Sequence, residues 1–182
     1  MPDFVIPAPT TPSIPVSGGG AFPVRRVYCI GRNYAAHAIE MGHDPDREAP
    51  FFFQKNPNNL DSTGEFPYPP HSSDVHHEVE LVVALKSGGS NIPLDQALNH
   101  VWGYAVGLDL TRRDLQQAAK KNGSSWEPAK AFDFSAPCSA FVPAAQCSSP
   151  SHNAIWLSVN GSMRQQAQIS DLLFSVSELV SM

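Results

Sequence analysis

Proline limits the length of every regular element that this sequence can form. The chain carries 17 prolines among 182 residues, and proline removes a backbone donor and breaks helices and central strands. Between the prolines lie β-rich apolar runs at 24–30, 51–54, 78–85 and 101–108, and short helical patterns at 34–41, 93–100 and 111–122. There is no internal repeat and no regular strand–helix alternation. The pattern predicts an α+β domain dominated by strands.

The first 23 residues differ in composition from the rest. They contain six prolines and the run Gly18-Gly19-Gly20, which is typical of an extended segment without packed structure. The remaining residues can form one domain with a substantial core, since 42% of the chain is apolar. We therefore expect a lead-in at 1–23 and a single domain at 24–182.

Local signals mark the ends of several elements. Thr111 can cap the helix at 111–122, with Asp114 three residues on in the capping-box position. Asn160-Gly161 after the strand at 155–159 predicts a β-hairpin turn. Ser175 and Glu178 form another capping-box pattern, which predicts a helix of one or two turns that depends on tertiary packing. The chain then stops without a C-cap, which we interpret as an interrupted sequence.

Charge, hydropathy and cysteine content exclude several classes of protein. The net charge is −5 and no dense cluster of Lys or Arg is present, which argues against nucleic acid or an anionic membrane as a partner. The apolar run at 81–85 is too short to span a bilayer, and the N-terminus lacks the pattern of a signal peptide. Three widely spaced cysteines, Cys29, Cys138 and Cys147, favour neither a disulfide framework nor a zinc site, so we expect a cytoplasmic protein.

Three acidic residues lie where apolar strands begin or end. Glu78 and Glu80 open the run at 81–85, and residues two apart on a strand share a face. Two adjacent carboxylates repel each other unless a cation or a proton intervenes. With Asp109, at the end of the strand at 101–108, they could form an all-oxygen site for Mg²⁺, Mn²⁺ or Ca²⁺. Alternatively, the two glutamates are solvated at a strand edge and Asp109 forms a turn or caps a helix.

A second group of residues could carry out acid–base chemistry. His37 and Glu40 are three apart on the expected helix, so the carboxylate could orient the imidazole as a general base. Lys130 is a lone cation among apolar residues and could bind a carboxylate or a developing oxyanion. The alternatives are an ordinary polar helix face and a lysine that extends to solvent. The pair His76-His77 also suggests zinc, but no Cys or third His stands at ligand spacing.

Five ordered motifs give the chain a family resemblance. They are residues 31–41 (GRNYAAHAIEM), 53–55 (FQK), 77–81 (HEVEL), 107–116 (GLDLTRRDLQ) and 129–133 (AKAFD), followed by a hairpin at 159–165. In this order they resemble the fumarylacetoacetate hydrolase family, from about residue 21 to the end. The spacing of His37 and Glu40 is similar to the acylpyruvase-like branch, and the segments around 41–47 and 51–55 resemble bacterial fumarylpyruvate hydrolases.

The resemblance implies a fold, a cofactor and roles for single residues. The fold would be a mixed β-sandwich roll that forms a homodimer, and the cofactor would be Mg²⁺ or Mn²⁺. Carried over residue by residue, the metal ligands are Glu78, Glu80 and Asp109, the catalytic residues are His37, Glu40 and Lys130, and the substrate-binding residues are Arg113, Gln116 and, less firmly, Lys55. Relatives continue through a further strand and a Thr-Gly-Thr-Pro-like loop that this chain lacks, so the catalytic domain at 24–182 would be incomplete.

The expected activity is hydrolysis of a carbon–carbon bond in a small acylpyruvate, such as fumarylpyruvate to fumarate and pyruvate in aromatic catabolism. The same metal chemistry permits oxaloacetate decarboxylation, or isomerisation and decarboxylation of 2-hydroxyhepta-2,4-diene-1,7-dioate. A third possibility is a remnant that binds metal without turnover, and the absent C-terminal segment motivates it. We also expect that the 182-residue chain alone is neither independently stable nor fully active, because apolar faces would be exposed.

Overall fold

The computed structural model describes residues 3–34, 49–148 and 150–182. The helix expected at 34–41, with His37 and Glu40, lies almost wholly outside these ranges. No helix among the described residues is long and apolar enough to cross a bilayer.

Two long antiparallel strands form the centre of the fold. Strand β7 (Val79–Leu85) pairs with β8 (Val101–Leu108), and the short strand β11 (Val142–Pro143) adds to the other side of β8. Both long strands occupy the apolar runs that predicted them. Gly103 permits the approach of β11, because a Cβ at this position would lie 2.4 Å from the carbonyl oxygen of Val142.

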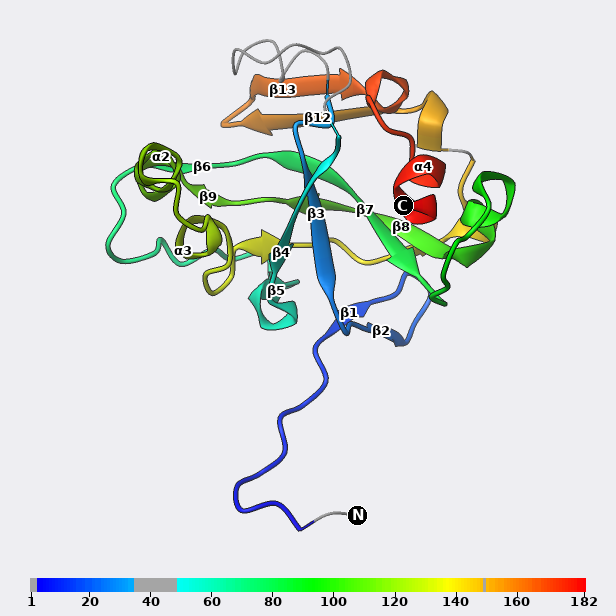
Figure 1. The fold of residues 1–182 in the computed structure, drawn as a ribbon, viewed down its shortest axis with the longest axis horizontal. Helices are drawn as coiled ribbons and strands as arrows, with labels where there is room; N and C mark the ends of the chain where they lie inside the picture. The colour runs from blue at the N-terminus through cyan, green and yellow to red at the C-terminus, as the bar shows by residue number, and fades with distance from the viewer. Residues whose placement is uncertain (1–2, 35–48, 149) are drawn as a thin grey trace.

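Pairs of shorter strands surround this centre. They are the antiparallel pairs β3 (Val27–Gly31) with β4 (Phe51–Lys55), β6 (Val75–His76) with β9 (Thr111–Arg112), and β12 (Ala154–Val159) with β13 (Ser162–Gln168), and the parallel pair β5 (Leu60–Asp61) with β10 (Ala136–Pro137). Figure 1 shows β3 and β4 crossing the β7–β8 pair, with the β12–β13 hairpin along one side. The expected strand-dominated α+β fold is confirmed.

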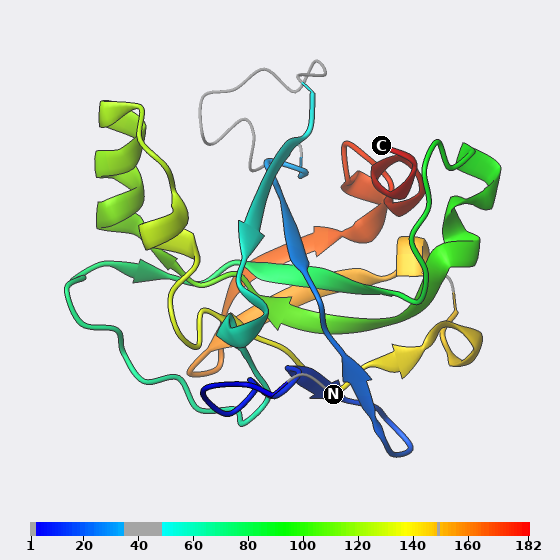
Figure 2. The ribbon, with the colours of Figure 1, turned by 60° about the horizontal axis from the view of Figure 1, so that its bottom comes forward.

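Helices lie at the two ends of the central strands. Helices α2 (Arg113–Asn122) and α3 (Glu127–Lys130) lie at one end, and α4 (Val176–Ser181) packs at the other beside the 3-10 helix η2 (Leu94–His100), as Figure 2 shows. The described residues form four further 3-10 helices between these elements: η1 (Pro57–Asn59), η3 (Ala144–Gln146), η4 (Pro150–His152) and η5 (Ile169–Asp171).

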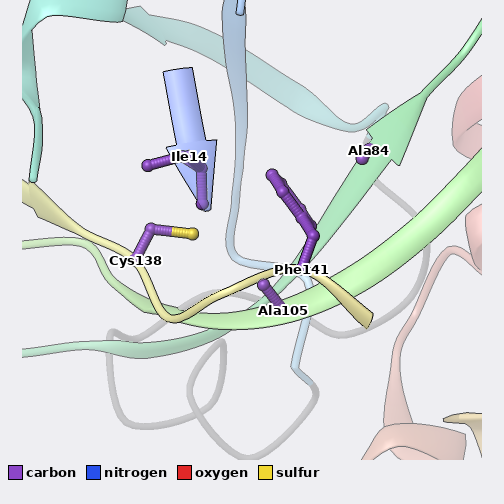
Figure 3. Packing of buried hydrophobic residues seen from close by; sticks show 5 residues of the cluster. All are labelled: Ile14, Ala84, Ala105, Cys138 and Phe141. Carbon is purple, nitrogen blue, oxygen red and sulfur yellow. The ribbon is translucent and has the colours of Figure 1, made fainter. Parts of the chain in front are cut away.

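Residues 3–11 are exposed and belong to no strand or helix, as expected of a lead-in, but residues 13–23 are packed, contrary to our expectation for 1–23. Strands β1 (Ser13–Pro15) and β2 (Ala21–Pro23) form an antiparallel hairpin. Ile14 is only 1% exposed and joins the central core with Ala84, Ala105, Cys138 and Phe141 (Figure 3). Pro15 and Pro23 are compatible with this hairpin because each is the last residue of its short strand.

Helix α2 begins two residues later than expected. It starts at Arg113, because Thr111 is paired in β9 opposite His76 and cannot cap the helix. The Asp114 carboxylate also has another role, since it accepts a hydrogen bond of 2.8 Å from the hydroxyl of Ser72. The predicted capping box at Thr111 is therefore wrong, and the long-range β6–β9 pairing explains the difference.

The predicted hairpin turn at Asn160 and the predicted short helix after Ser175 are confirmed. Asn160 and Gly161 have φ of 51° and 79° and form the turn of the β12–β13 hairpin. At α4, the backbone nitrogen of Glu178 donates to Ser175 Oγ at 3.3 Å, and the backbone nitrogen of Ser175 donates to Glu178 Oε2 at 2.8 Å. The hydroxyl of Ser181 donates to the carbonyl of Ile92 at 2.6 Å, so the short helix has a tertiary anchor beside η2.

Candidate active site

A cavity of about 350 Å³ opens between the central strands, the β3–β4 pair, the β12–β13 hairpin and helices α2 and α3. Six residues predicted for the site line it: Glu78, Glu80, Asp109, Arg113, Gln116 and Lys130. The chain thus brings residues from separate motifs to one concave surface. His37 and Glu40 lie outside the described residues, although Tyr34, just before them, lines the same cavity.

The β7–β8 ladder brings the three acids together. Glu80 lies opposite Gly107, and the backbone nitrogen of Asp109 donates to the carbonyl oxygen of Glu78 at 2.8 Å. Asp109 follows the last residue of β8 and Glu78 precedes the first residue of β7, so antiparallel pairing places both at the same edge. Glu80 is two residues beyond Glu78 and shares its face.

Two cations neutralise Glu78. Lys130 Nζ lies 2.8 Å from Glu78 Oε2, and Arg113 Nη2 lies 2.7 Å from Glu78 Oε1. Burial by itself raises the pKa of Glu78, but the Lys130 ammonium and the Arg113 guanidinium outweigh it and hold this pKa below its ordinary value. Arg113 also donates from Nη1 to Gln116 Oε1 at 2.6 Å. Glu78 is therefore ionised and fixed in position.

Glu80 has the opposite electrostatic environment. Burial, followed by the negative charges of Asp109 and Glu78, raises the pKa of Glu80 to about 8. No described residue forms an ion pair with it. At neutral pH this carboxyl group therefore holds a proton unless a further cation enters the cavity.

Asp109 is held by two lysines. Lys130 Nζ lies 2.6 Å from Asp109 Oδ2, and Lys55 Nζ lies 2.9 Å from Asp109 Oδ1. Lys130 and Lys55 are each only 3% exposed. The Lys130 ammonium thus lies between Glu78 and Asp109, two of the three expected metal ligands.

The residues fit a divalent cation bound through oxygen. Asp109 Oδ1 is buried and accepts no hydrogen bond of good geometry in the described chain, despite the nearby Lys55. The protonated Glu80 would become ionised beside an ion, and an all-oxygen donor set suits Mg²⁺ or Mn²⁺. In the arrangement described, however, no three Asp, Glu, His or Cys side chains converge as a metal-binding group. Lys130 would therefore have to shift for all three carboxylates to meet one ion.

Known proteins resemble this chain in both sequence and structure. The family model described as "Fumarylacetoacetate (FAA) hydrolase C-terminal" matches residues 26–182. This chain belongs to the fumarylacetoacetate hydrolase family. Its relatives in this family are enzymes with several activities, which include hydrolysis, tautomerisation and decarboxylation.

Three relatives show the range of the family. A fumarylpyruvate hydrolase from Pseudomonas aeruginosa, crystallised with Mn²⁺ and pyruvate, superposes with a TM-score of 0.95 at 50% identity, over 98% of this chain and 79% of that one. An oxaloacetate tautomerase of Arabidopsis thaliana, named as mitochondrial, is 36% identical over 86% of this chain and 70% of its own length. An oxaloacetate decarboxylase of Dictyostelium discoideum, also named as mitochondrial, is 37% identical over 86% and 72%.

Lys55 occupies a different place from the other family positions. It does not line the cavity; instead its ammonium lies beneath Asp109 and donates to the carbonyl oxygens of Leu110, at 3.1 Å, and of Lys130. Burial lowers the pKa of Lys55, while the Asp109 carboxylate acts in the opposite direction. Contact with substrate is therefore not the role that its position supports. Lys55 holds Asp109 and Lys130 in place.

Replacing Lys55 with Met should destabilise the protein by about 1–3 kcal/mol, because Asp109 keeps only one of its two cations and the carbonyl oxygens of Leu110 and Lys130 lose a donor. Urea unfolding without added metal measures this free energy. Lys121→Met, on the exposed end of α2, is the matched control and should change stability by less than about 0.5 kcal/mol. A loss below about 1 kcal/mol for Lys55→Met would contradict the positioning role.

Two residues to which local sequence patterns gave no function, Gln165 in the hairpin and Asn33 after β3, hold distant segments together. Gln165 accepts a hydrogen bond at Oε1 from the backbone nitrogen of Val79, at 2.9 Å, and donates from Nε2 to the carbonyl of His77, at 3.2 Å. These bonds fasten β13 beside the first residues of β7. Asn33 likewise exchanges hydrogen bonds with the backbone of Phe174. Partners more than 80 residues away give no local signal, so only the family hairpin motif pointed to Gln165.

Two further lining residues, Lys120 and Trp126, were not predicted at all. Lys120 Nζ lies 5.1 Å from the centre of the Trp126 ring. The sequence offered one clue, since Lys120 is seven residues after Arg113 and so shares its helix face.

Proposed function

We propose that this protein hydrolyses the carbon–carbon bond of a small acylpyruvate, with fumarylpyruvate as the preferred substrate and Mg²⁺ or Mn²⁺ as cofactor. The observation that carries the proposal is 50% identity, over 98% of the chain, with a fumarylpyruvate hydrolase crystallised with Mn²⁺ and pyruvate. The acids and cations that line the cavity support it chemically. Homodimer formation, cytoplasmic location and a role in aromatic catabolism are further expectations from the same relationship.

The chain's own residues divide the work. Glu78, Glu80 and Asp109 would hold the ion, which when bound polarises the 2-oxo acid end of the substrate and stabilises the negative charge of the leaving pyruvate. Arg113, fixed by Glu78 and Gln116, would donate to substrate oxygens at this end. Lys130 would donate to the oxygen that becomes negative when water attacks the distal carbonyl. His37, oriented by Glu40, would take the proton from that water.

A second candidate function is the tautomerisation or decarboxylation of oxaloacetate. The observation that favours it is the 36–38% identity with curated relatives that carry these names. The same acids and cations would serve, because both reactions also develop negative charge on the oxygen of a 2-oxo acid.

Kinetics of the purified chain with each substrate test the proposal. We expect kcat/KM for fumarylpyruvate to exceed that for oxaloacetate by at least about 100-fold, a difference of roughly 2.7 kcal/mol in transition-state binding. Pyruvate release is followed with fumarylpyruvate, and enol absorbance and pyruvate release with oxaloacetate, each against a blank that contains Mn²⁺ alone. Chelation should abolish turnover and Mn²⁺ should restore it. A preference for oxaloacetate would overturn the hydrolase assignment, and metal binding without turnover would indicate a non-catalytic remnant.

A further inference from the structure

The cavity concentrates positive charge in a chain that is acidic overall. Five of the 12 Lys and Arg residues line it, although the net charge of the chain is −5. They are Arg32, Arg113, Lys120, Lys130 and Arg164, and among the described lining residues they face three carboxylates. A bound divalent ion would add to the excess, so the cavity is suited to a ligand with more than one negative charge.

Helix α2 carries cations at both of its ends along one face. Three residues of this face line the cavity: Arg113 in the first turn, Gln116 in the middle and Lys120 in the last turn. The seven residues from Arg113 to Lys120 correspond to two turns, or about 10 Å along the helix axis. Arg113 lies at the carboxylates, where it binds Glu78 at 2.7 Å. Lys120 is therefore a second cationic point on the cavity wall, two helical turns from Arg113.

The surroundings of Lys120 leave its charge available to a ligand. Its ammonium lies over the ring of Trp126, which in turn packs on Phe51 with ring centres 4.8 Å apart. Burial, and then the positive charges of Arg113 and Arg32, lower the pKa of Lys120. No carboxylate in the described ranges forms an ion pair with it. An anion bound here would relieve the repulsion among these cations.

We propose that Lys120, seated on Trp126, binds a carboxylate at the far end of the substrate and makes the site selective for long 2-oxo diacids. This inference rests on the function proposed above, in which the 2-oxo acid end of the substrate binds at the metal. A seven-carbon diacid such as fumarylpyruvate extends along α2 toward Lys120. Four-carbon oxaloacetate is too short to occupy both ends, so Lys120 also separates the two candidate substrates.

Binding of a matched pair of unreactive acids tests this role without turnover. 2-Oxoadipate and 2-oxohexanoate have the same number of carbons, but only the first has a distal carboxylate, and neither has the second carbonyl group that hydrolysis requires. Calorimetry in the presence of Mn²⁺ should show that the wild type binds 2-oxoadipate with at least about tenfold higher affinity than 2-oxohexanoate, as expected for one charge-assisted contact. Lys120→Gln should lose about tenfold in affinity for 2-oxoadipate and nothing for 2-oxohexanoate.

Two further variants serve as controls. Lys120→Arg keeps the charge and should retain most of the preference, whereas Lys121→Gln removes an adjacent charge outside the cavity and should bind both acids like the wild type. Equal affinity of the wild type for the two acids, no binding of either, or a Lys120→Gln loss shared by both would overturn the inference. If the preference holds but fumarylpyruvate is not cleaved, the proposed hydrolase function fails and the distal anion site stands. If fumarylpyruvate is cleaved but Lys120→Gln changes nothing, only the distal site fails.

Discussion

Glu80→Gln should weaken Mn²⁺ binding by at least about 100-fold, because affinity in oxygen sites depends on the number of charged ligands. Turnover of fumarylpyruvate should fall by a similar or larger factor, since the ion contributes several kcal/mol to transition-state stabilisation. Calorimetric titration with MnCl₂ measures the first effect and pyruvate release the second. Glu65→Gln, an exposed acid that does not line the cavity, is the matched control and should leave both unchanged.

The same variant should behave differently without metal. In the wild type the pKa of Glu80, about 8, lies above the ordinary value of 4.5, so Glu80 favours the folded state while it is protonated. That contribution is complete below about pH 4.5 and is lost as the pH rises through about 8. At pH 9 the metal-free Glu80→Gln protein should therefore melt roughly 5 °C or more above the wild type, and the difference should shrink toward pH 5. A variant that melts below the wild type at pH 9 would show that Glu80 is not a destabilising buried charge.

Lys130→Gln should separate catalysis from metal binding. The loss of the donor to the developing oxyanion should lower kcat by about 10²–10³-fold. Mn²⁺ affinity should rise by roughly tenfold, because Lys130 Nζ lies within 2.8 Å of Glu78 and 2.6 Å of Asp109 and competes with the ion for both. Kinetics and calorimetry on the same preparation measure the two changes.

The opposite changes in activity and affinity make this prediction specific. A variant that had merely misfolded would lose both properties, so a gain in affinity excludes that explanation. Lys121→Gln should leave kcat and Mn²⁺ affinity as in the wild type. Unchanged kcat in Lys130→Gln, or weaker Mn²⁺ binding, would contradict the role assigned to this lysine.

The elements that the sequence predicted well depend on local information. The long apolar runs predicted β7 and β8, and the two-residue spacing of Glu78 and Glu80 predicted that both acids share one face of a strand. The turn at Asn160 followed from its own residue type and that of the next glycine. In each case the residues that decide the structure are neighbours in the sequence.

The elements that were missed depend on partners far away in the chain. Ile14 packs against Phe141 and Ala105 in the core. The proline-rich composition of its own segment does not indicate this burial. The roles of Lys55 and Lys120 likewise come from packing, since one lies beneath Asp109 and the other on Trp126. Local patterns can show that a side chain is unusual for its surroundings, but they cannot say which carboxylate or ring it will meet.

The proposed hydrolase function requires that this site add water across a carbon–carbon bond of fumarylpyruvate. Mass spectrometry of the products formed in H₂¹⁸O with Mn²⁺ tests it most directly, because the attacking water becomes part of the released carboxylate. We expect pyruvate together with fumarate that carries one ¹⁸O atom, and no fumarate after chelation of the metal. Substrate that is only tautomerised, or that loses carbon dioxide without releasing fumarate, would contradict the account.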